Sequence, residues 1–269
     1  MKIGTQEFET TGKTYVMGIL NVTPDSFSDG GRYDNLDAAL KHVEEMCGDG
    51  MDVLDIGGES TRPGHTPVSD QQELDRVLPV IEAVKTRFDV PISLDTSKSA
   101  VAEAGIRAGA DLINDVWGLK HDPEMAKVIA RYGVACCLMH NRKDPDYRML
   151  IPDLCADLEE SLALADEAGI DREKIILDPG VGFGKTYEQN LAIIHHLEEF
   201  HRFELPILLG TSRKSVIGMT LETPPEERLE GTLVTTVLAV EKGCNFVRVH
   251  DVKENVRAIR MTRAILEAE

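Results

Sequence analysis

The hydrophobic positions of the chain fall into two alternating patterns. Short, mostly apolar runs, typical of buried strands, alternate with longer segments in which apolar residues recur every three or four positions, as on one face of a helix. This unit occurs eight times along the chain. The expected strands cover residues 15–21, 52–56, 91–95, 111–115, 134–139, 174–178, 206–210 and 245–250.

The longer segments predict helices over residues 36–47, 70–88, 99–108, 123–132, 153–168, 188–200, 225–242 and 253–267. Each is long enough to carry the chain from one strand to a parallel neighbour. Gly109, Gly133 and Gly243 stand where three of these helices should end, and glycine readily adopts the left-handed conformation of a helix terminus. Eight strand–helix units predict an α/β fold, a (β/α)8 barrel.

Residues 1–269 are expected to form one domain. A barrel commonly occupies ~250 residues, and no Ser/Gly-rich linker or low-complexity tract divides the chain. An open, doubly wound sheet is the alternative, but its first strand usually leads into a Gly-rich dinucleotide turn. The residues that follow the first expected strand, Val22, Thr23 and Pro24, do not form such a turn, so the barrel is favoured.

The composition narrows the possible partners and the compartment. A formal net charge of −18 argues against general binding to nucleic acid or to anionic membranes, which requires a basic face. Five cysteines without a CxxC pair are typical of reduced thiols, so a cytoplasmic location is expected. We also expect neither a signal peptide nor a membrane span, because Gly18 interrupts the first apolar run, over residues 15–20.

Polar residues stand at the ends of nearly all the expected strands. In a parallel barrel the carboxyl ends of the strands meet at one face, and this face carries the chemistry. The groups that fall there include Asn21, Asp55, Asp95, Asn114, Asp178, Gly210, Arg248 and His250.

Asp and Asn after a strand often do no more than cap the next helix. Asp95 and Asp178 are stronger candidates, because each follows an apolar run that leads toward the barrel mouth, where a buried carboxylate requires a partner. Asn114 and Asp115 are adjacent, and side chains alternate along a strand. Only one of the two therefore faces inward, and we expect this to be Asn114.

Cationic side chains are the second feature of the same face. A single Lys or Arg is usually a solvated surface charge, but here the second, seventh and eighth units all supply cations, and the last two units of a barrel often bind phosphate. Gly-rich loops over residues 25–31, 57–64 and 179–185 suggest moving lids. These features predict an enzyme for a substrate with a phosphate or diphosphate and a flat hydrogen-bonding group. The cations are Arg62, Arg213, Lys214, Arg248 and His250.

Seven segments, spread over the chain in order, resemble the dihydropteroate synthase family. The longest is MGILNVTPDSFSDGG, over residues 17–31. The others are DIGGESTRPG (55–64), SLDT (93–96), INDV (113–116), LDPGVGFG (177–184), GTSRKS (210–215) and RVHDV (248–252).

The resemblance implies the condensation of 6-hydroxymethyl-7,8-dihydropterin diphosphate with 4-aminobenzoate, which yields 7,8-dihydropteroate and diphosphate for folate synthesis. It implies that Mg2+ is required, with Asn21 as a metal ligand, and that Asp95, Lys214 and Arg248 are catalytic. It also implies a homodimer, and sulfonamides as competitors of the arylamine. The implied pterin site is Asp95, Asn114, Asp178, Gly210 and Lys214; the diphosphate site is Asn21, Thr61, Arg62, Arg248 and His250; the aminobenzoate site is Thr61, Pro63, Phe183, Lys214 and Ser215.

Two other functions remain open at this point. Pterin-dependent methyltransferases are similar barrels that read the same pterin edge with an Asp–Asn–Asp set. A catalytically silent pterin-binding protein is the alternative from another class. The first loop, together with Lys214 and Arg248, favours a diphosphate substrate over both.

Overall fold

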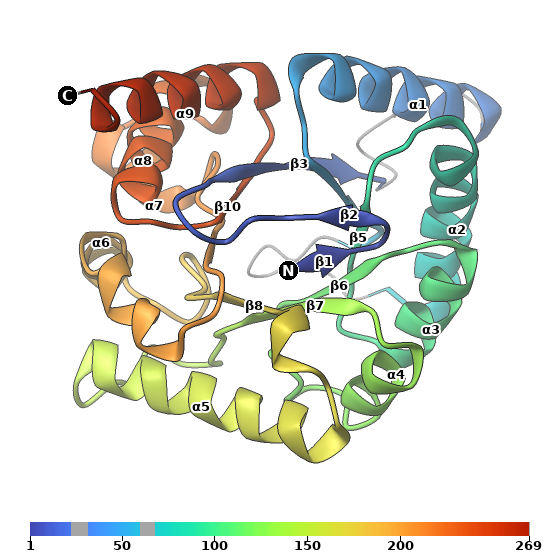
Figure 1. Ribbon diagram of the computed structural model, residues 1–269, viewed down its shortest axis with the longest axis horizontal. Coiled ribbons are helices and arrows are strands. Elements are labelled where there is room, and N and C mark those ends of the chain that lie inside the picture. The colour runs from blue at the N-terminus through green and yellow to red at the C-terminus, as the bar shows by residue number, and fades with distance from the viewer. Residues whose placement is uncertain (23–31, 60–67, 269) are drawn as a thin grey trace.

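The computed structural model describes residues 1–22, 32–59 and 68–268 and contains a ring of parallel strands with helices around it (Figure 1). The strands follow one another in the order β8-β7-β6-β5-β4-β3-β10-β9, and a parallel bridge between Leu177 and Ile207 joins the two ends. The barrel expected from the sequence is therefore confirmed. Its strands are β3 (Tyr15–Asn21), β4 (Val53–Gly57), β5 (Ile92–Asp95), β6 (Leu112–Asp115), β7 (Ala135–Met139), β8 (Ile175–Asp178), β9 (Leu208–Leu209) and β10 (Phe246–Val249).

The helices form the outer layer (Figure 1). Among the described residues, the first six α-helices each link two consecutive strands, the next two both lie between β9 and β10, and the last follows β10. Gly133 ends one of them in the left-handed conformation, with φ 61°, as its position in the sequence predicted. The α-helices are α1 (Arg32–Asp49), α2 (Asp70–Arg87), α3 (Ser99–Ala108), α4 (Met125–Tyr132), α5 (Leu150–Ala168), α6 (Tyr187–His195), α7 (Ser215–Leu221), α8 (Leu229–Glu241) and α9 (Val252–Leu266).

Two expected helices were drawn too long. The segment 188–200 divides into α6 and a 3-10 helix, Leu197–Phe203, and the segment 225–242 divides into a 3-10 turn, Pro225–Glu227, and α8. Proline lacks a backbone N–H and suits the first turn of a helix, and Pro225 opens the 3-10 turn in this way; Arg228 then separates the turn from α8. None of the helices in the described ranges is long and apolar enough to cross a membrane.

An apolar floor fills the amino-terminal half of the barrel. The hairpin of β1 (Lys2–Ile3) and β2 (Gln6–Glu7), which the sequence patterns did not reveal, lies across this end and inserts Ile3 and Phe8 (Figure 1). Phe8 packs against the rings of Tyr15 and Phe246, with centroid distances of 4.9 Å and 5.7 Å. The remaining floor residues are Met17, Val53, Leu112, Ala135, Cys137, Ile176 and Leu208.

The floor determines where the polar groups must lie. Side chains alternate along a strand, so the residue two positions beyond each floor residue also faces the barrel interior, one layer nearer the carboxyl ends. Asp55 follows Val53 in this way, Asn114 follows Leu112, Asp178 follows Ile176 and Arg248 follows Phe246. The period of the strand thus places a polar layer directly above an apolar one.

Candidate active site

Asp55 lies at the centre of the polar layer, although the sequence analysis gave it no role. Its side chain is fully buried. One oxygen, Oδ1, accepts from Ser93 Oγ at 2.5 Å and from Asn114 Nδ2 at 3.5 Å, and Oδ2 accepts from Arg248 Nε at 2.6 Å. A buried carboxylate is tolerated only when it is paired, and the alternation from Val53 is the sequence signal that could have found it.

Arg248 joins this central group to the mouth of the barrel. Its Nη2 donates to Asp95 Oδ2 at 2.8 Å, while its Nε is held by Asp55. Burial by itself would lower the pKa of Arg248, but the two carboxylates raise it above its ordinary value. The guanidinium is therefore a permanent cation, fixed in direction by two partners.

Asp95 has one oxygen in use and one in reserve. It is 5% exposed, and its Oδ1 is buried with no hydrogen-bond partner among the described residues. Burial raises the pKa of Asp95 to about 7, against the opposing effect of Arg248. An unsatisfied buried acceptor carries a large desolvation cost, so this oxygen is suited to accept a hydrogen bond from a bound molecule.

Asn114 and Asp115 point in opposite directions, as the alternation of side chains predicted. Asn114 faces inward to Asp55. Asp115 instead accepts from the backbone N–H groups of Trp117 at 2.9 Å and Leu119 at 2.7 Å, so it shapes its own loop and takes no part in the polar layer.

Asp178 and Gly210 form the opposite wall of the site. Asp178 Oδ1 accepts from the Gly180 backbone at 2.7 Å, and burial raises the pKa of this carboxyl, partly offset by Lys214. A methyl group on Gly210 would lie 3.6 Å from Asp178 Oδ2 and 3.8 Å from Arg248 Cβ. Glycine therefore leaves an open surface between these side chains.

Lys214 approaches Asp178 from the loop that precedes α7. Burial lowers the pKa of Lys214 to about 8, and Asp178 opposes this shift. Its ammonium donates to the Val181 carbonyl and lies 4.7 Å from the centroid of the Phe183 ring. Ser215 follows as the first residue of α7 and is exposed.

Asn21 and His250 lie at the carboxyl ends of two paired strands, since Asn21 is the last residue of β3 and His250 follows β10. Asn21 is in register with Gly57, which is in register with Asp95; a methyl group on Gly57 would lie 3.8 Å from Asn21 Oδ1 and 3.6 Å from Asp95 Cβ. His250 Nδ1 is 3.0 Å from Ser212 Oγ.

Four of the expected residues remain to be accounted for. Arg213 donates to both carboxylate oxygens of Asp251, at 2.5 Å and 3.1 Å, so it is engaged in an ion pair. Thr61, Arg62 and Pro63 lie outside the described residues.

The site is a preorganised array of opposite charges on an apolar floor. Carboxylates and an amide are placed to read the N–H groups of a flat heterocycle, and the cations are placed to hold an anionic group beside it. At the carboxyl-terminal mouth of a parallel barrel, this arrangement defines an enzyme for a nitrogen-rich heterocycle with an anionic leaving group.

Comparison with known proteins agrees with this class. The chain matches the pterin binding enzyme family over residues 17–250. It is 57% identical over 267 residues to the dihydropteroate synthase of Clostridium beijerinckii, with 99% of each chain covered. Among solved structures, the dihydropteroate synthase of Clostridium difficile in the presence of pteroic acid superposes with a TM-score of 0.93 at 49% identity, with both chains covered completely.

A second solved structure, the dihydropteroate synthase of Yersinia pestis with a sulfonamide drug, gives a TM-score of 0.94 at 45% identity, covering 100% of this chain and 99% of that one. The chain therefore belongs to the dihydropteroate synthases of the pterin binding enzyme family. It is a transferase that condenses 6-hydroxymethyl-7,8-dihydropterin diphosphate with 4-aminobenzoate in folate biosynthesis, rather than a methyltransferase or a silent binder.

Proposed function

We propose that the polar layer above the barrel floor holds the pterin ring. Asp178 accepts from the adjacent N–H donors of the 2-amino-4-oxo ring, and Asn114 both donates and accepts at its edge. The free Oδ1 of Asp95 takes a further donor, and it is this buried, unpartnered oxygen that most directly supports the assignment. Gly210 gives the flat ring room between Asp178 and Arg248, and Lys214 completes the proposed pterin site.

An Asp178→Asn substitution tests the pterin assignment. It preserves shape but replaces one acceptor oxygen with a donor that opposes the N–H groups of the ring. We expect the affinity for the dihydropterin diphosphate, measured by titration calorimetry, to fall about 100-fold, in line with the penalty for unpaired buried polar groups. Asp166→Asn, in an exposed ion pair with Arg172, is the matched control; equal affinity in both variants would refute the assignment.

The diphosphate belongs to the mouth of the barrel. Arg248 and His250 lie there, and Arg248 is held at full charge by Asp55 and Asp95. Arg62 and Thr61 of the second loop complete this set in our proposal. Fixed cations at the leaving group are effective because they require no reorganisation when charge develops.

Mg2+ is proposed as the accompanying metal. The described residues contain no group of three or more His, Cys, Asp or Glu side chains that could hold a metal ion, whereas Mg2+ is often bound by one or two protein oxygens together with substrate phosphates and water. Asn21 Oδ1, across Gly57 from Asp95, fits such a partial site. Bound there, the metal would neutralise charge on the diphosphate.

The reaction exchanges one bond at the pterin methylene. The C–O bond to diphosphate breaks, and its electron pair leaves with the diphosphate oxygen. The amine nitrogen of 4-aminobenzoate forms the new C–N bond to the methylene carbon and loses one proton to the medium. Positive charge develops on the pterin methylene as the diphosphate departs. We propose that Asp95, together with Lys214 and Arg248, sets the electrostatics of this step, with the Asp95 carboxylate offsetting the positive charge.

The 4-aminobenzoate site is proposed to lie between Phe183, Lys214 and Ser215, with Thr61 and Pro63 contributed by the second loop. The Phe183 ring and the Lys214 ammonium already face each other, and the pair would contact the ring and the carboxylate of the arylamine. A sulfonamide, present in the related Yersinia pestis structure, would compete for this slot.

A homodimer and a cytoplasmic location complete the proposal. α8 and α9 pack side by side (Figure 1) and leave Val234, Met261 and Ile265 at least 60% exposed; large exposed apolar side chains on two adjacent helices favour an interface. The other side of α8, with Thr235 and Ala239, is buried against the barrel. All five cysteines are free thiols, which suits a reducing compartment.

A further inference from the structure

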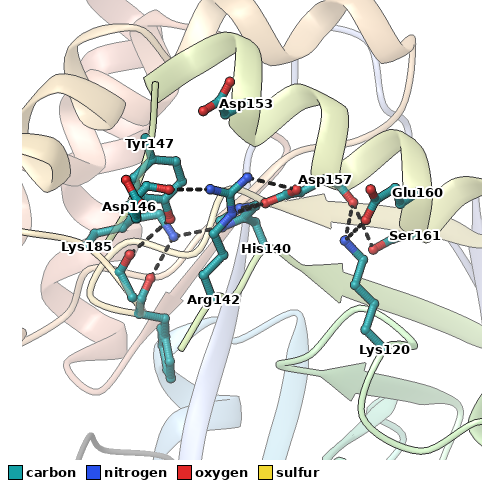
Figure 2. Close-up of polar contacts among 12 residues, drawn as sticks. Lys120, His140, Arg142, Asp146, Tyr147, Asp153, Asp157, Glu160, Ser161 and Lys185 are labelled. Atoms are coloured by element: carbon teal, nitrogen blue, oxygen red, sulfur yellow. Dashed lines mark hydrogen bonds and ion pairs between the residues drawn. The ribbon is translucent and has the colours of Figure 1, made fainter. Parts of the chain in front are cut away.

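A second polar cluster lies beside the site, between β7, α5 and the loop that follows β8 (Figure 2). Asp157 of α5 accepts from His140 Nε2 at 2.7 Å and from Arg142 through Nε at 2.5 Å and Nη2 at 3.0 Å. On the other side of the imidazole, Lys185 Nζ lies 2.9 Å from His140 Nδ1. The four side chains thus form one continuous chain of contacts.

The donors in this chain can be assigned from its two ends. The Asp157 carboxylate can only accept, so the proton of the neutral ring lies on Nε2, facing Asp157, and Nδ1 accepts from Lys185 Nζ. Burial, reinforced by Lys185, lowers the pKa of His140 to about 3, which keeps the ring neutral. The imidazole therefore contacts Lys185 through a single hydrogen bond, which Nδ1 accepts.

Lys185 passes this constraint to the loop between β8 and α6. Its ammonium also donates to the Phe183 carbonyl at 2.8 Å. Burial lowers the pKa of Lys185 to about 7; Asp178 and Asp157 oppose this shift, while Lys214 and Arg142 reinforce it.

The loop is built to lie close to the segment 140–142. Gly180 and Gly184 have φ values of 71° and 55°, and a methyl group on either would overlap the backbone carbonyl of His140 or Arg142. Tyr147 Oη donates to the Gly184 carbonyl at 3.0 Å. Gly180 and Gly184 thus hold the two ends of the loop close to residues 140–142. Between them, the Phe183 carbonyl accepts from Lys185, which fixes the middle of the loop.

We propose that Lys185 is a positioning residue for the arylamine slot, held by the Asp157–His140 pair and acting through the Phe183 backbone. The same loop carries the Phe183 ring and the Val181 carbonyl, and both contact Lys214. A displacement of the loop therefore moves two sides of the slot at once, while Asp178 and Asn114 stay on their strands. The inference rests on the proposed assignment of Phe183 to 4-aminobenzoate.

Lys185→Met removes the charge and both hydrogen bonds but keeps the apolar stem. We expect the KM for 4-aminobenzoate to rise about tenfold, since misplacements of about 1 Å are costly in a preorganised site, while the KM for the dihydropterin diphosphate changes less than about twofold. Lys185→Gln, which retains a shorter donor, should recover part of the loss. The matched control is Lys174→Met, whose ammonium donates to the Gly133 carbonyl away from the mouth, at 2.6 Å.

A purely structural role gives a different result, in which thermal stability and kcat fall but the two KM values stay unchanged; that outcome would overturn the inference, as would equal increases in both KM values. A second variant, Phe183→Ala, distinguishes a failure of the positioning role of Lys185 from a failure of the Phe183 assignment. If Phe183→Ala leaves the KM for 4-aminobenzoate unchanged, the assignment of Phe183 fails. If that KM rises in Phe183→Ala but not in Lys185→Met, only the positioning role fails.

Discussion

At the scale of single residues, the site depends on how each buried charge is balanced. Asp55 and Asp95 share one guanidinium, and Asp55 receives two further donors, whereas Asp95 retains a free oxygen. The difference separates a carboxylate that organises the site from one that is available to a substrate.

Asp95→Asn keeps the shape of this side chain and removes its charge. If the carboxylate offsets positive charge on the pterin methylene, kcat should fall by a factor of ~100 to 1,000, the range observed for preorganised electrostatic groups, with a smaller effect on the KM for the arylamine. Steady-state kinetics of the purified variant measures this, with Asp166→Asn as the control. An unchanged kcat in Asp95→Asn would show that the carboxylate does not offset positive charge on the methylene.

The lowered pKa of Lys214 predicts a pH dependence. Burial brings the pKa of this group to about 8, so it is charged below pH 8 and neutral above. We expect kcat/KM for the dihydropterin diphosphate, at saturating 4-aminobenzoate, to decline as the pH rises through about 8. In Lys214→Arg this decline should vanish from the range, because a guanidinium stays charged. If kcat/KM of Lys214→Arg still declined with the same midpoint pH, the decline would belong to another titrating group.

At the scale of secondary-structure elements, the sequence predicts the ring of strands well because apolar runs record burial directly. β3 and α3 have the bounds expected from the pattern. The hairpin β1–β2 and the helix α7 were not found, since elements of two and seven residues are too short to show a period. The contact from His140 to Lys185 joins residues 45 positions apart, and no local pattern records such a pairing.

The hairpin closes the floor beneath the site, which leads to a prediction about stability. Phe8 is 4% exposed and packs on Tyr15 and Phe246. Phe8→Ala should lower the free energy of unfolding by about 3 kcal/mol, measured by chemical denaturation. Because the polar layer lies above the floor, kcat at low temperature should stay close to that of the unsubstituted protein. A large loss of kcat in folded Phe8→Ala would show that the floor and the site are coupled.

At the scale of the whole molecule, the resemblance of the motifs predicted the reaction, which the fold alone could not, since a barrel hosts many chemistries. The alternation of strands and the polar residues at their ends predicted the class of substrate. Asp55 was placed among the polar groups of this face but was given no role, because it stands within a strand between Leu54 and Ile56 and its central position shows only once the floor is known.

The exposed apolar face of α8 and α9 predicts that the enzyme is a dimer in solution. Val234→Glu places a charge on this face at a position that is 60% exposed in the single chain, so folding should be preserved while association is lost. Sedimentation equilibrium should give twice the chain mass for the unsubstituted enzyme and the chain mass for the variant. Leu191→Glu, on α6, is the control. Twice the chain mass for both proteins would place the interface elsewhere, and the single-chain mass for the unsubstituted enzyme would contradict the dimer.

The most direct test of the central claim is the coupling of diphosphate release to product formation. Purified enzyme is given the dihydropterin diphosphate and Mg2+, with and without 4-aminobenzoate, and diphosphate and dihydropteroate are measured together. The account predicts one diphosphate for each dihydropteroate, release that depends on the arylamine, and rates of both that fall ~100- to 1,000-fold in Asp95→Asn. Diphosphate release that continues without arylamine, or pterin binding without any dihydropteroate, would contradict it.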